Sequence, residues 1–177
     1  MNKRTICLVL TLVCALTMLA QHYNIVKNIA YTMKTDTYSA QRLKLDIYYQ
    51  EQATDLPVVV WFHGGGLTSG EKDFPYKLKE KNCVLVAVNY RLLPNVTIDQ
   101  TIDDAAEAVA WVMNHITEYG GSTKKMIVSG HSAGGYLTMM LALNKQWLDR
   151  YGKDANQIAA YVPFSGQAIS HFSYRKM

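Results

Sequence analysis

Hydrophobic and polar residues follow two patterns along the chain. In Leu43–Tyr49 they alternate with a period of two, which is typical of a strand buried on one face only. We expect this strand to pair antiparallel with the preceding Tyr- and Thr-rich segment, Tyr31–Tyr38, at an edge of a sheet. Four later segments are continuously apolar, as in parallel strands that are covered on both faces: Val58–Phe62, Val84–Val88, Met126–Ser129 and Ala159–Phe164.

Helical periodicity lies between these strands. The clearest helix is predicted for Ile98–Tyr119, where apolar residues recur every three or four positions, and Thr97 and Gln100 fit a capping box at its start. A second helix is predicted after Ser132, extending through Leu148, and a short one from Phe74 to Lys81. Strands that alternate with helices form βαβ units. The predicted class is therefore α/β, with a mostly parallel central sheet and helices on both faces.

The composition fits a folded protein of one domain. The chain has 177 residues, of which 49% are hydrophobic and 18% are charged, so disorder, collagen-like repeats and coiled coils are excluded. The net charge of +4 is spread along the chain without a basic run, which argues against nucleic-acid binding. No residue spacing indicates metal ligands, a phosphate loop or a dinucleotide site, so we expect neither a metal nor a cofactor.

The first twenty residues have the pattern of a secretory signal peptide. Lys3 and Arg4 form a short positive region, and the apolar run that follows ends at Ala20. We expect cleavage after that residue, secretion or export to the periplasm, and no membrane span in the mature domain, residues 21–177. Two alternatives stay open, namely an uncleaved N-terminal anchor and a lipoprotein modified at Cys14.

The strongest chemical signal is the segment Gly130-His-Ser-Ala-Gly134, which matches the pattern G-x-S-x-G. An apolar strand enters it and a helical pattern leaves it, so we expect Ser132 on a sharp, strained turn between strand and helix. Gly130 and Gly134 allow the close packing that such a turn requires. The turn raises the serine hydroxyl above the end of the sheet and places the backbone N–H of Ala133 at a helix start, where negative charge is stabilised.

A second signal is the segment His63-Gly64-Gly65-Gly66, which directly follows the strand Val58–Phe62. Three consecutive glycines let a loop approach a ligand closely and point backbone N–H groups at one spot. Acyl transfer needs such an oxyanion hole, because its tetrahedral intermediate carries charge on the former carbonyl oxygen. Alone, the segment also fits a flexible glycine turn with an incidental histidine. The nucleophile motif downstream favours the oxyanion hole.

Together, the two motifs resemble the α/β-hydrolase superfamily, and within it the hormone-sensitive-lipase-like branch of bacterial carboxylesterases and lipases. The resemblance covers about Leu43–Gly166 and includes three further segments: Leu45–Tyr48, Asn89–Leu92 with Pro94, and Asp103–Ala105. It implies an α/β-hydrolase fold of which this chain holds the N-terminal part, without the last strands.

The resemblance also implies a role for each motif residue. Ser132 is the expected nucleophile, and His63 is expected to support the oxyanion loop with Gly64 by hydrogen bonding rather than act as the base. His131 is expected to neighbour the site without a catalytic role. The expected oxyanion donors are the backbone N–H groups of Gly65, Gly66 and Ala133.

The catalytic acid and base depart from the family's pattern. The triad order is Ser, then Asp or Glu, then His, and after Ser132 this chain offers Asp154 and His171. The aspartate precedes the strand Ala159–Phe164, whereas active sites of open parallel sheets lie beyond the carboxyl ends of strands. This triad therefore stays an alternative. We expect instead that the last strands, the acid and the histidine lie beyond residue 177.

The sequence thus predicts a secreted serine hydrolase that acts on a small-molecule or carbohydrate ester without a cofactor. An exopeptidase of the same fold is an alternative, and so is an inactive fragment or a non-catalytic protein of this fold, because the triad is incomplete. The acyl group, the alcohol and the oligomeric state stay open. Arg91 with Asp103 or Asp104 is expected to form a structural ion pair rather than a substrate clamp.

Overall fold

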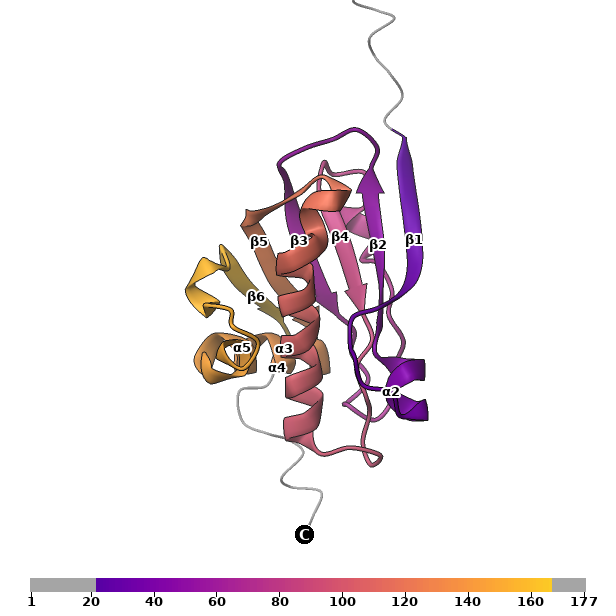
Figure 1. Ribbon diagram of the computed structural model, residues 1–177, viewed down its shortest axis with the longest axis vertical. Helices are drawn as coiled ribbons and strands as arrows, with labels where there is room; N and C mark the ends of the chain where they lie inside the picture. Colours follow the sequence, from indigo (N-terminus) through magenta and orange to yellow (C-terminus); the bar gives the residue numbers. More distant parts are fainter. Residues whose placement is uncertain (1–21, 167–177) are drawn as a thin grey trace, which may run out of the picture.

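Six strands form the sheet at the centre of the molecule (Figure 1): β1 (Tyr23–Ala30), β2 (Lys44–Gln50), β3 (Leu56–Phe62), β4 (Val84–Val88), β5 (Gly121–His131) and β6 (Ala160–Phe164). The computed structural model describes residues 22–166. The strand order is β1-β2-β4-β3-β5-β6. The four strands from β4 to β6 in this order run parallel, and β1 and β2 are antiparallel to their neighbours. The predicted α/β class with a mostly parallel sheet is confirmed.

Three of the helices pack on one face of this sheet. They are α3 (Ile98–His115), α4 (Ala133–Leu143) and α5 (Gln146–Asp149), and their apolar side chains share a core with β3, β4 and β5. On the opposite face a smaller cluster holds Tyr48, Val59, Cys83 and Leu85, against which Tyr23, Phe74 and Leu78 pack. The continuously apolar pattern of β3 and β4 follows from this arrangement, because alternate residues of each strand enter the two clusters.

The long helix predicted from the sequence is confirmed. It begins as α3 at Ile98, ends at His115 and continues as a 3₁₀ turn, η2 (Ile116–Tyr119). Thr97 and Gln100 form the predicted capping box, in which the Thr97 hydroxyl accepts from the Gln100 N–H and the Gln100 side chain accepts from the Thr97 N–H. The cap satisfies two of the N–H groups that a helix start leaves without partners.

The prediction that Tyr31–Tyr38 pairs with β2 was wrong. The strand that pairs with β2 is β1, whereas Tyr31–Tyr38 leads into the short helix α2 (Thr37–Arg42). Asp36 explains the difference, because its carboxylate accepts a hydrogen bond from the Ser39 N–H and caps that helix. Tyr31 is turned into the core rather than into a strand ladder, and its hydroxyl donates to the Asn89 carbonyl at 2.7 Å.

Two predicted helices are shorter than expected. The helix after Ser132 ends at Leu143, because Asn144 has an extended backbone and its side-chain oxygen accepts from the N–H of Gln146, where the separate helix α5 begins. Between Phe74 and Lys81 only one 3₁₀ turn forms, η1 (Tyr76–Leu78). Pro75 starts that turn, and Phe74 and Leu78 serve to cover the second face of the sheet.

The strand register sets the place of the functional motifs. Phe62 lies opposite Val88 on one side and Gly130 on the other, and His131 lies opposite Phe164. The strands β3, β4, β5 and β6 therefore finish at the same end of the sheet, the end of their carboxyl termini. Both sequence motifs lie on loops at this end, as expected for a site at the carboxyl ends of parallel strands.

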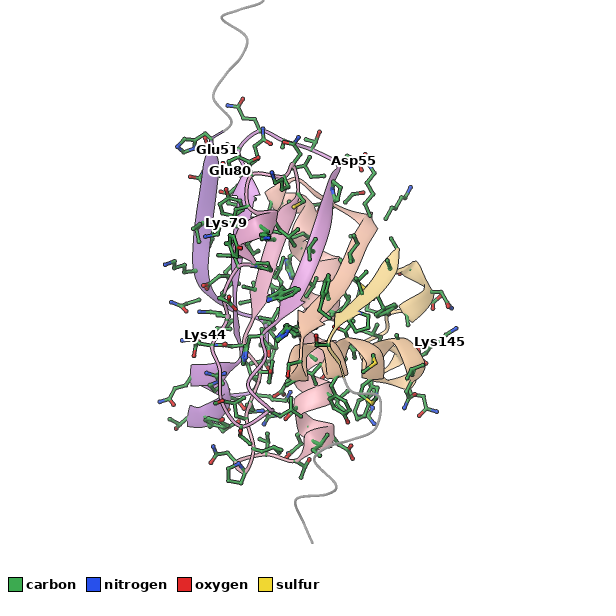
Figure 2. The ribbon with its side chains drawn as sticks, turned by 180° about the vertical axis from the view of Figure 1, so that it is seen from behind. Lys44, Glu51, Asp55, Lys79, Glu80 and Lys145 are labelled. Atoms are coloured by element: carbon green, nitrogen blue, oxygen red, sulfur yellow. The ribbon has the colours of Figure 1, made fainter. Side chains whose placement is uncertain are left out.

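Charged side chains such as Glu51, Asp55, Glu80 and Lys145 are exposed at the periphery of the molecule (Figure 2). Between residues 22 and 166 no helix has both the length and the apolar character needed to cross a membrane. The predicted signal peptide, including its cleavage point after Ala20, lies outside the described residues.

Candidate active site

Ser132 occupies the turn between β5 and α4, where its backbone is strained. Its φ of 54° and ψ of −114° lie outside the regions that side chains favour, a conformation that costs about 1–3 kcal/mol. The surrounding backbone holds it there, since the Ser132 N–H donates to the Phe164 carbonyl at 2.8 Å and the Tyr136 N–H donates to the Ser132 carbonyl at 2.9 Å. The predicted strand-turn-helix context of this serine is present.

Two glycines allow the turn to sit against the end of β3. A Cβ on Gly134 would lie 2.0 Å from the carbonyl oxygen of Phe62, and a Cβ on Gly130 would lie 2.6 Å from the carbonyl oxygen of Gly134. Neither distance is possible for a real side chain, so α4 approaches β3 closely only because both positions lack one. Gly135 has the same constraint on the side of β6, where a Cβ would meet the Phe164 carbonyl oxygen at 2.7 Å.

The glycine-rich loop after β3 lies beside Ser132. A Cβ on Gly64 would lie 3.5 Å from the Ser132 Cβ and 3.2 Å from the His131 carbonyl oxygen. Gly65 and Gly66 have φ values of 113° and 63°, in the left-handed region that glycine tolerates. The structure thus brings the two sequence motifs together at one edge of the sheet. Ala133, the third expected donor, is buried at the first position of α4.

His63 is held inside the loop rather than presented to a substrate. Only 4% of its surface is exposed, and its Nδ1 lies 2.6 Å from the Gly64 carbonyl oxygen. Because a carbonyl only accepts, Nδ1 carries the proton in this contact. Burial lowers the pKa of His63, which keeps the imidazole neutral. These contacts are the ones that the expected supporting role requires.

Tyr90 packs against this histidine. Its ring stacks on the imidazole with centroids 4.4 Å apart, and its hydroxyl donates to the His63 carbonyl at 2.7 Å. Tyr90 is fully buried, which raises the pKa of its phenol and keeps the hydroxyl protonated. Neither sequence motif contains this residue, and its segment, Asn89–Leu92, entered the prediction only as part of the family resemblance. The available signal was an aromatic residue directly after a buried strand.

Arg42 and Asn89, which neither sequence motif contains, hold the far end of the glycine-rich loop at Glu71 and Lys72. The Glu71 carboxylate accepts from Arg42 Nη1 at 2.7 Å and from the Asn89 side-chain amide. The Asn89 side-chain oxygen accepts from the Lys72 N–H at 2.6 Å. The loop is therefore anchored to the end of β4 as well as to its own strand.

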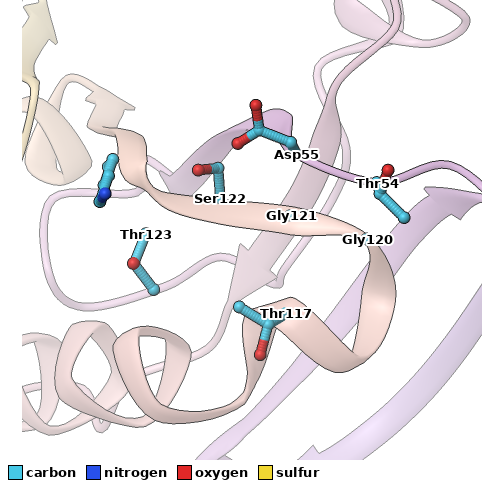
Figure 3. A pocket seen from close by; sticks show the side chains of 8 residues that line it. Thr54, Asp55, Thr117, Gly120, Gly121, Ser122 and Thr123 are labelled. Atoms are coloured by element: carbon cyan, nitrogen blue, oxygen red, sulfur yellow. The ribbon is translucent and has the colours of Figure 1, made fainter.

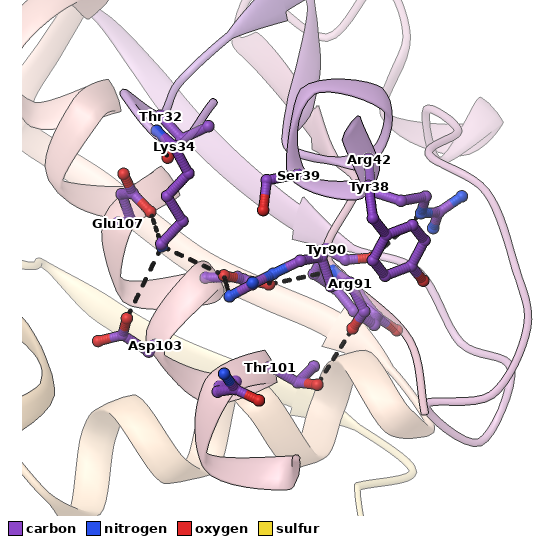
Figure 4. Close-up of polar contacts among 12 residues, drawn as sticks. Thr32, Lys34, Tyr38, Ser39, Arg42, Tyr90, Arg91, Thr101, Asp103 and Glu107 are labelled. Carbon is purple, nitrogen blue, oxygen red and sulfur yellow. Dashed lines mark hydrogen bonds and ion pairs between the residues drawn. The ribbon is translucent and has the colours of Figure 1, made fainter. Parts of the chain in front are cut away.

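The expected ion pair at Arg91 is present, and its partner is Asp104 on α3 (Figure 4). The Asp104 carboxylate is fully buried and accepts from the Arg91 Nη2 at 2.6 Å, the Nε at 2.8 Å and the backbone N–H at 3.1 Å. Hydrogen bonding to this carboxylate raises the pKa of the guanidinium. Asp103 instead contacts Lys34, Arg150 and Tyr151. The pair is structural, since it ties the segment after β4 to the long helix.

Asp154 does not reach the predicted nucleophile. Its carboxylate accepts from the Asn156 N–H at 2.8 Å and caps a 3₁₀ turn, η3 (Ala155–Gln157), ahead of the first residue of β6. Ser132 follows the last residue of the parallel neighbour β5, so the two residues belong to opposite ends of the sheet. The alternative triad is therefore not assembled through Asp154. His171, its other member, lies outside the described residues.

A hollow with a volume of about 350 Å³ lies at the opposite end of β5 (Figure 3). Gly120 to Lys124 line it together with Thr54, Asp55 and Thr117. Gly121 is the first residue of β5, whereas Ser132 follows the last one, so this hollow is remote from the serine. Within residues 22–166 no group of three or more His, Cys, Asp or Glu side chains is placed to hold a metal ion.

Comparison with known proteins agrees with this geometry. The BD-FAE family model matches residues 45–172. The chain is 30% identical over 149 residues to "Probable isoprenylcysteine alpha-carbonyl methylesterase ICMEL1" of Oryza sativa subsp. japonica, in a match that covers 76% of this chain and 35% of the relative. It is 35% identical over 118 residues to "Probable carboxylic ester hydrolase LipM" of Mycobacterium tuberculosis, covering 62% of this chain and 27% of that protein.

A solved structure shares the fold. Esterase B of Lactobacillus rhamnosis has a TM-score of 0.63 at 19% identity, over 92% of this chain and 54% of that one. The chain spans about a third of the length of the curated relatives it matches.

Proposed function

The chain belongs to the BD-FAE family of the α/β-hydrolase superfamily, and from this premise we propose that it supplies the nucleophile and the oxyanion hole of a serine hydrolase that cleaves carboxylic esters. The names of the relatives, a methylesterase and a carboxylic ester hydrolase, support ester substrates. We propose small-molecule or carbohydrate esters as the substrate class.

The observation that carries the proposal is the strained backbone of Ser132 beside the glycine-rich loop. Strain at a residue that is neither glycine nor asparagine persists only where the surroundings impose it, and such residues cluster at active sites. Here Gly130, Gly134 and the Phe164 carbonyl impose it. The same turn leaves Ser132 partly exposed at the start of α4, where its hydroxyl caps no N–H group of the helix.

The proposed reaction proceeds through an acyl-enzyme. The Ser132 oxygen attacks the ester carbonyl, its proton passes to a base, and the negative charge on the carbonyl oxygen is held by the N–H groups of Gly65, Gly66 and Ala133. The alcohol then leaves with a proton, and water hydrolyses the acyl-enzyme by the same steps in reverse. Ala133 is the first residue of α4, and the positive end of the helix dipole there adds to the stabilisation.

The base and the acid are proposed to come from outside residues 22–166. A Ser–His–Asp site without its base retains only the residual catalysis of the oxyanion hole. If those groups are missing, the alternative of a non-catalytic protein of this fold applies.

A serine-directed fluorophosphonate probe tests the proposal on the whole protein. We expect labelling and hydrolysis of p-nitrophenyl esters by the wild type, and loss of both in Ser132→Ala. Ser122→Ala is the matched control, because Ser122 lies near the other end of β5 and should leave both signals unchanged. A folded wild type that is neither labelled nor active would refute the proposal. Faster hydrolysis of aminoacyl anilides than of aryl esters would favour the exopeptidase alternative.

We also propose that the protein is exported after cleavage behind Ala20. The positive region at Lys3 and Arg4 and the apolar run after it support this. N-terminal sequencing of the protein from its native cells should give Gln21 as the first residue. An intact Met1 would overturn the proposal and favour the uncleaved anchor.

A further inference from the structure

We propose that Tyr90 is a positioning residue for the oxyanion hole, which it supports through both the carbonyl and the ring of His63. The inference rests on the function proposed above and adds a residue that neither sequence motif contains. The hydroxyl of Tyr90 has two contacts in the structure, and both are with His63: the carbonyl oxygen at 2.7 Å and the ring Nδ1 at 3.4 Å.

The geometry of the peptide unit couples each carbonyl of the loop to the N–H group of the next residue. A peptide is planar and trans, so the carbonyl of one residue and the N–H of the next point in opposite directions within one plane. A hydrogen bond that fixes the carbonyl therefore fixes the direction of the next N–H. In a glycine-rich loop this matters more than elsewhere, because glycine itself restricts the peptide planes least.

Each of the three peptide units that begin at His63 is fixed in this way. The Tyr90 hydroxyl holds the carbonyl of His63, and thereby the N–H of Gly64. The His63 imidazole holds the carbonyl of Gly64 at 2.6 Å, and thereby the N–H of Gly65. The Gly65 carbonyl accepts from the Ser69 N–H and from the Ser69 hydroxyl, both at 3.0 Å, which fixes the N–H of Gly66.

Tyr90 is the residue that holds His63, the first residue of this series, in place. His63 orients the Gly65 peptide only if its own ring is held, and the ring is held by stacking on Tyr90 at 4.4 Å with an interplanar angle of 11°. Tyr90 in turn is fully buried, packs near Phe62, and is anchored by Arg42, whose Nε donates to the Tyr90 carbonyl at 3.2 Å. Figure 4 shows Tyr90 together with Arg42 and Arg91 in this part of the molecule.

The chemistry of the hydroxyl fits this role. Burial raises the pKa of the Tyr90 phenol, so it stays a donor at any pH at which the enzyme would act. Donors aimed at a developing oxyanion contribute most when they need no reorganisation during the reaction. A support that fixes those donors should therefore act on kcat rather than on ground-state binding.

The test is Tyr90→Phe in the whole protein, which keeps the stacked ring but removes the hydroxyl, and with it both the bond to the His63 carbonyl and the contact with the ring Nδ1. We expect kcat for a p-nitrophenyl ester to fall about tenfold with KM within about twofold, since removing an oxyanion donor itself costs a hundredfold or more. Tyr161→Phe is the control, because the Tyr161 hydroxyl also donates to a backbone carbonyl, that of Ala155, far from the loop. Equal kcat in the two variants would overturn the proposal.

A second readout separates this inference from the proposed function. Amide hydrogen exchange of the segment 63–66 should be faster in Tyr90→Phe than in the wild type and unchanged in Tyr161→Phe. If the wild type shows no turnover that depends on Ser132, the proposed function fails. The positioning role is then decided by exchange alone, and unchanged exchange refutes it.

Should Tyr90→Phe fail to fold, the wild type provides the measurement. We expect a slowly exchanging hydroxyl proton of Tyr90 in NMR spectra, with a nuclear Overhauser contact to the His63 backbone. A hydroxyl that exchanges rapidly with solvent would overturn the proposal.

Discussion

The two ends of the parallel sheet are built from similar backbone elements but are held by different forces. At the amino end of β5, Gly120 has a φ of 76° and Asp55 a φ of 58°, so both take left-handed conformations. At the carboxyl end, Gly65, Gly66 and Ser132 also have positive φ values. The amino end is closed by an exposed ion pair between Lys125 and Asp55, whereas the carboxyl end is closed by the buried groups of His63, Tyr90 and Asp104.

The difference is consistent with the proposed site at the carboxyl end. An exposed ion pair is weakened by solvent and holds its atoms loosely. A buried polar group without its partner is costly, so a network of such groups admits few alternative arrangements. The carboxyl end therefore positions its N–H groups within narrow limits. At the amino end, Asp55, which lines the hollow, forms its ion pair in an exposed position instead.

The largest effect is expected from breaking the buried ion pair. Arg91→Met leaves the fully buried Asp104 carboxylate with Lys34 as its remaining cation, at 3.5 Å. We expect the free energy of unfolding to fall by about 3–5 kcal/mol, measured by urea denaturation, because the buried carboxylate loses two hydrogen bonds and its nearest cation, which Lys34 replaces only in part. The double variant Arg91→Met with Asp104→Leu should be more stable than the single variant. A loss below about 1 kcal/mol in Arg91→Met would abolish the contrast between the two ends.

A smaller effect is expected from the pH dependence of His63. Burial lowers its pKa in the folded state, so the unfolded chain takes up a proton near pH 6.5 that the folded chain does not bind. Stability should fall as the pH decreases through that value, and this contribution should level off below the lowered pKa. The urea midpoint between pH 7.5 and 5.5 should therefore drop more in the wild type than in His63→Gln. His115→Gln is the control, because its side chain is 42% exposed. An equal drop of the urea midpoint between pH 7.5 and 5.5 in His63→Gln and the wild type would contradict the buried, neutral state of His63.

Much of this site could be predicted from the sequence, because it depends on local rules. Two short motifs identified Ser132 and the His63 loop, since glycine spacing and strand-to-helix context are visible in a single sequence. The parallel strands were equally visible as apolar runs. The register then placed both motifs at one edge, because strands of a parallel sheet end on the same side.

The supports of the site were not predictable in the same way. Tyr90, Asn89 and Arg42 act on the loop across long sequence separations, and no local pattern encodes which carbonyl a buried hydroxyl will meet. The pairing of β1 with β2 was missed for a related reason. Asp36 caps the helix that forms where the sequence resembled a strand. The period of apolar residues does not reveal such a cap.

The smallest effect is expected at the exposed ion pair of the amino end. Lys125 Nζ lies 2.6 Å from the Asp55 carboxylate, and hydrogen bonding to Lys125 lowers the pKa of that carboxyl. Because the pKa is lowered, the contribution of this ion pair to stability is present above the ordinary pKa of aspartate and is lost as the pH falls through the lowered value.

The side chains of Lys125 and Asp55 are 49% and 67% exposed, so water and salt screen the attraction. We therefore expect Lys125→Met to leave the urea midpoint at pH 7 unchanged within error, at low and at high salt alike. Both Arg91→Met and Lys125→Met remove the cation of a short ion pair, so they differ chiefly in burial. A loss in Lys125→Met as large as that in Arg91→Met would mean that burial is not what distinguishes the two ends, and that the amino-end hollow is held as firmly as the edge that carries Ser132.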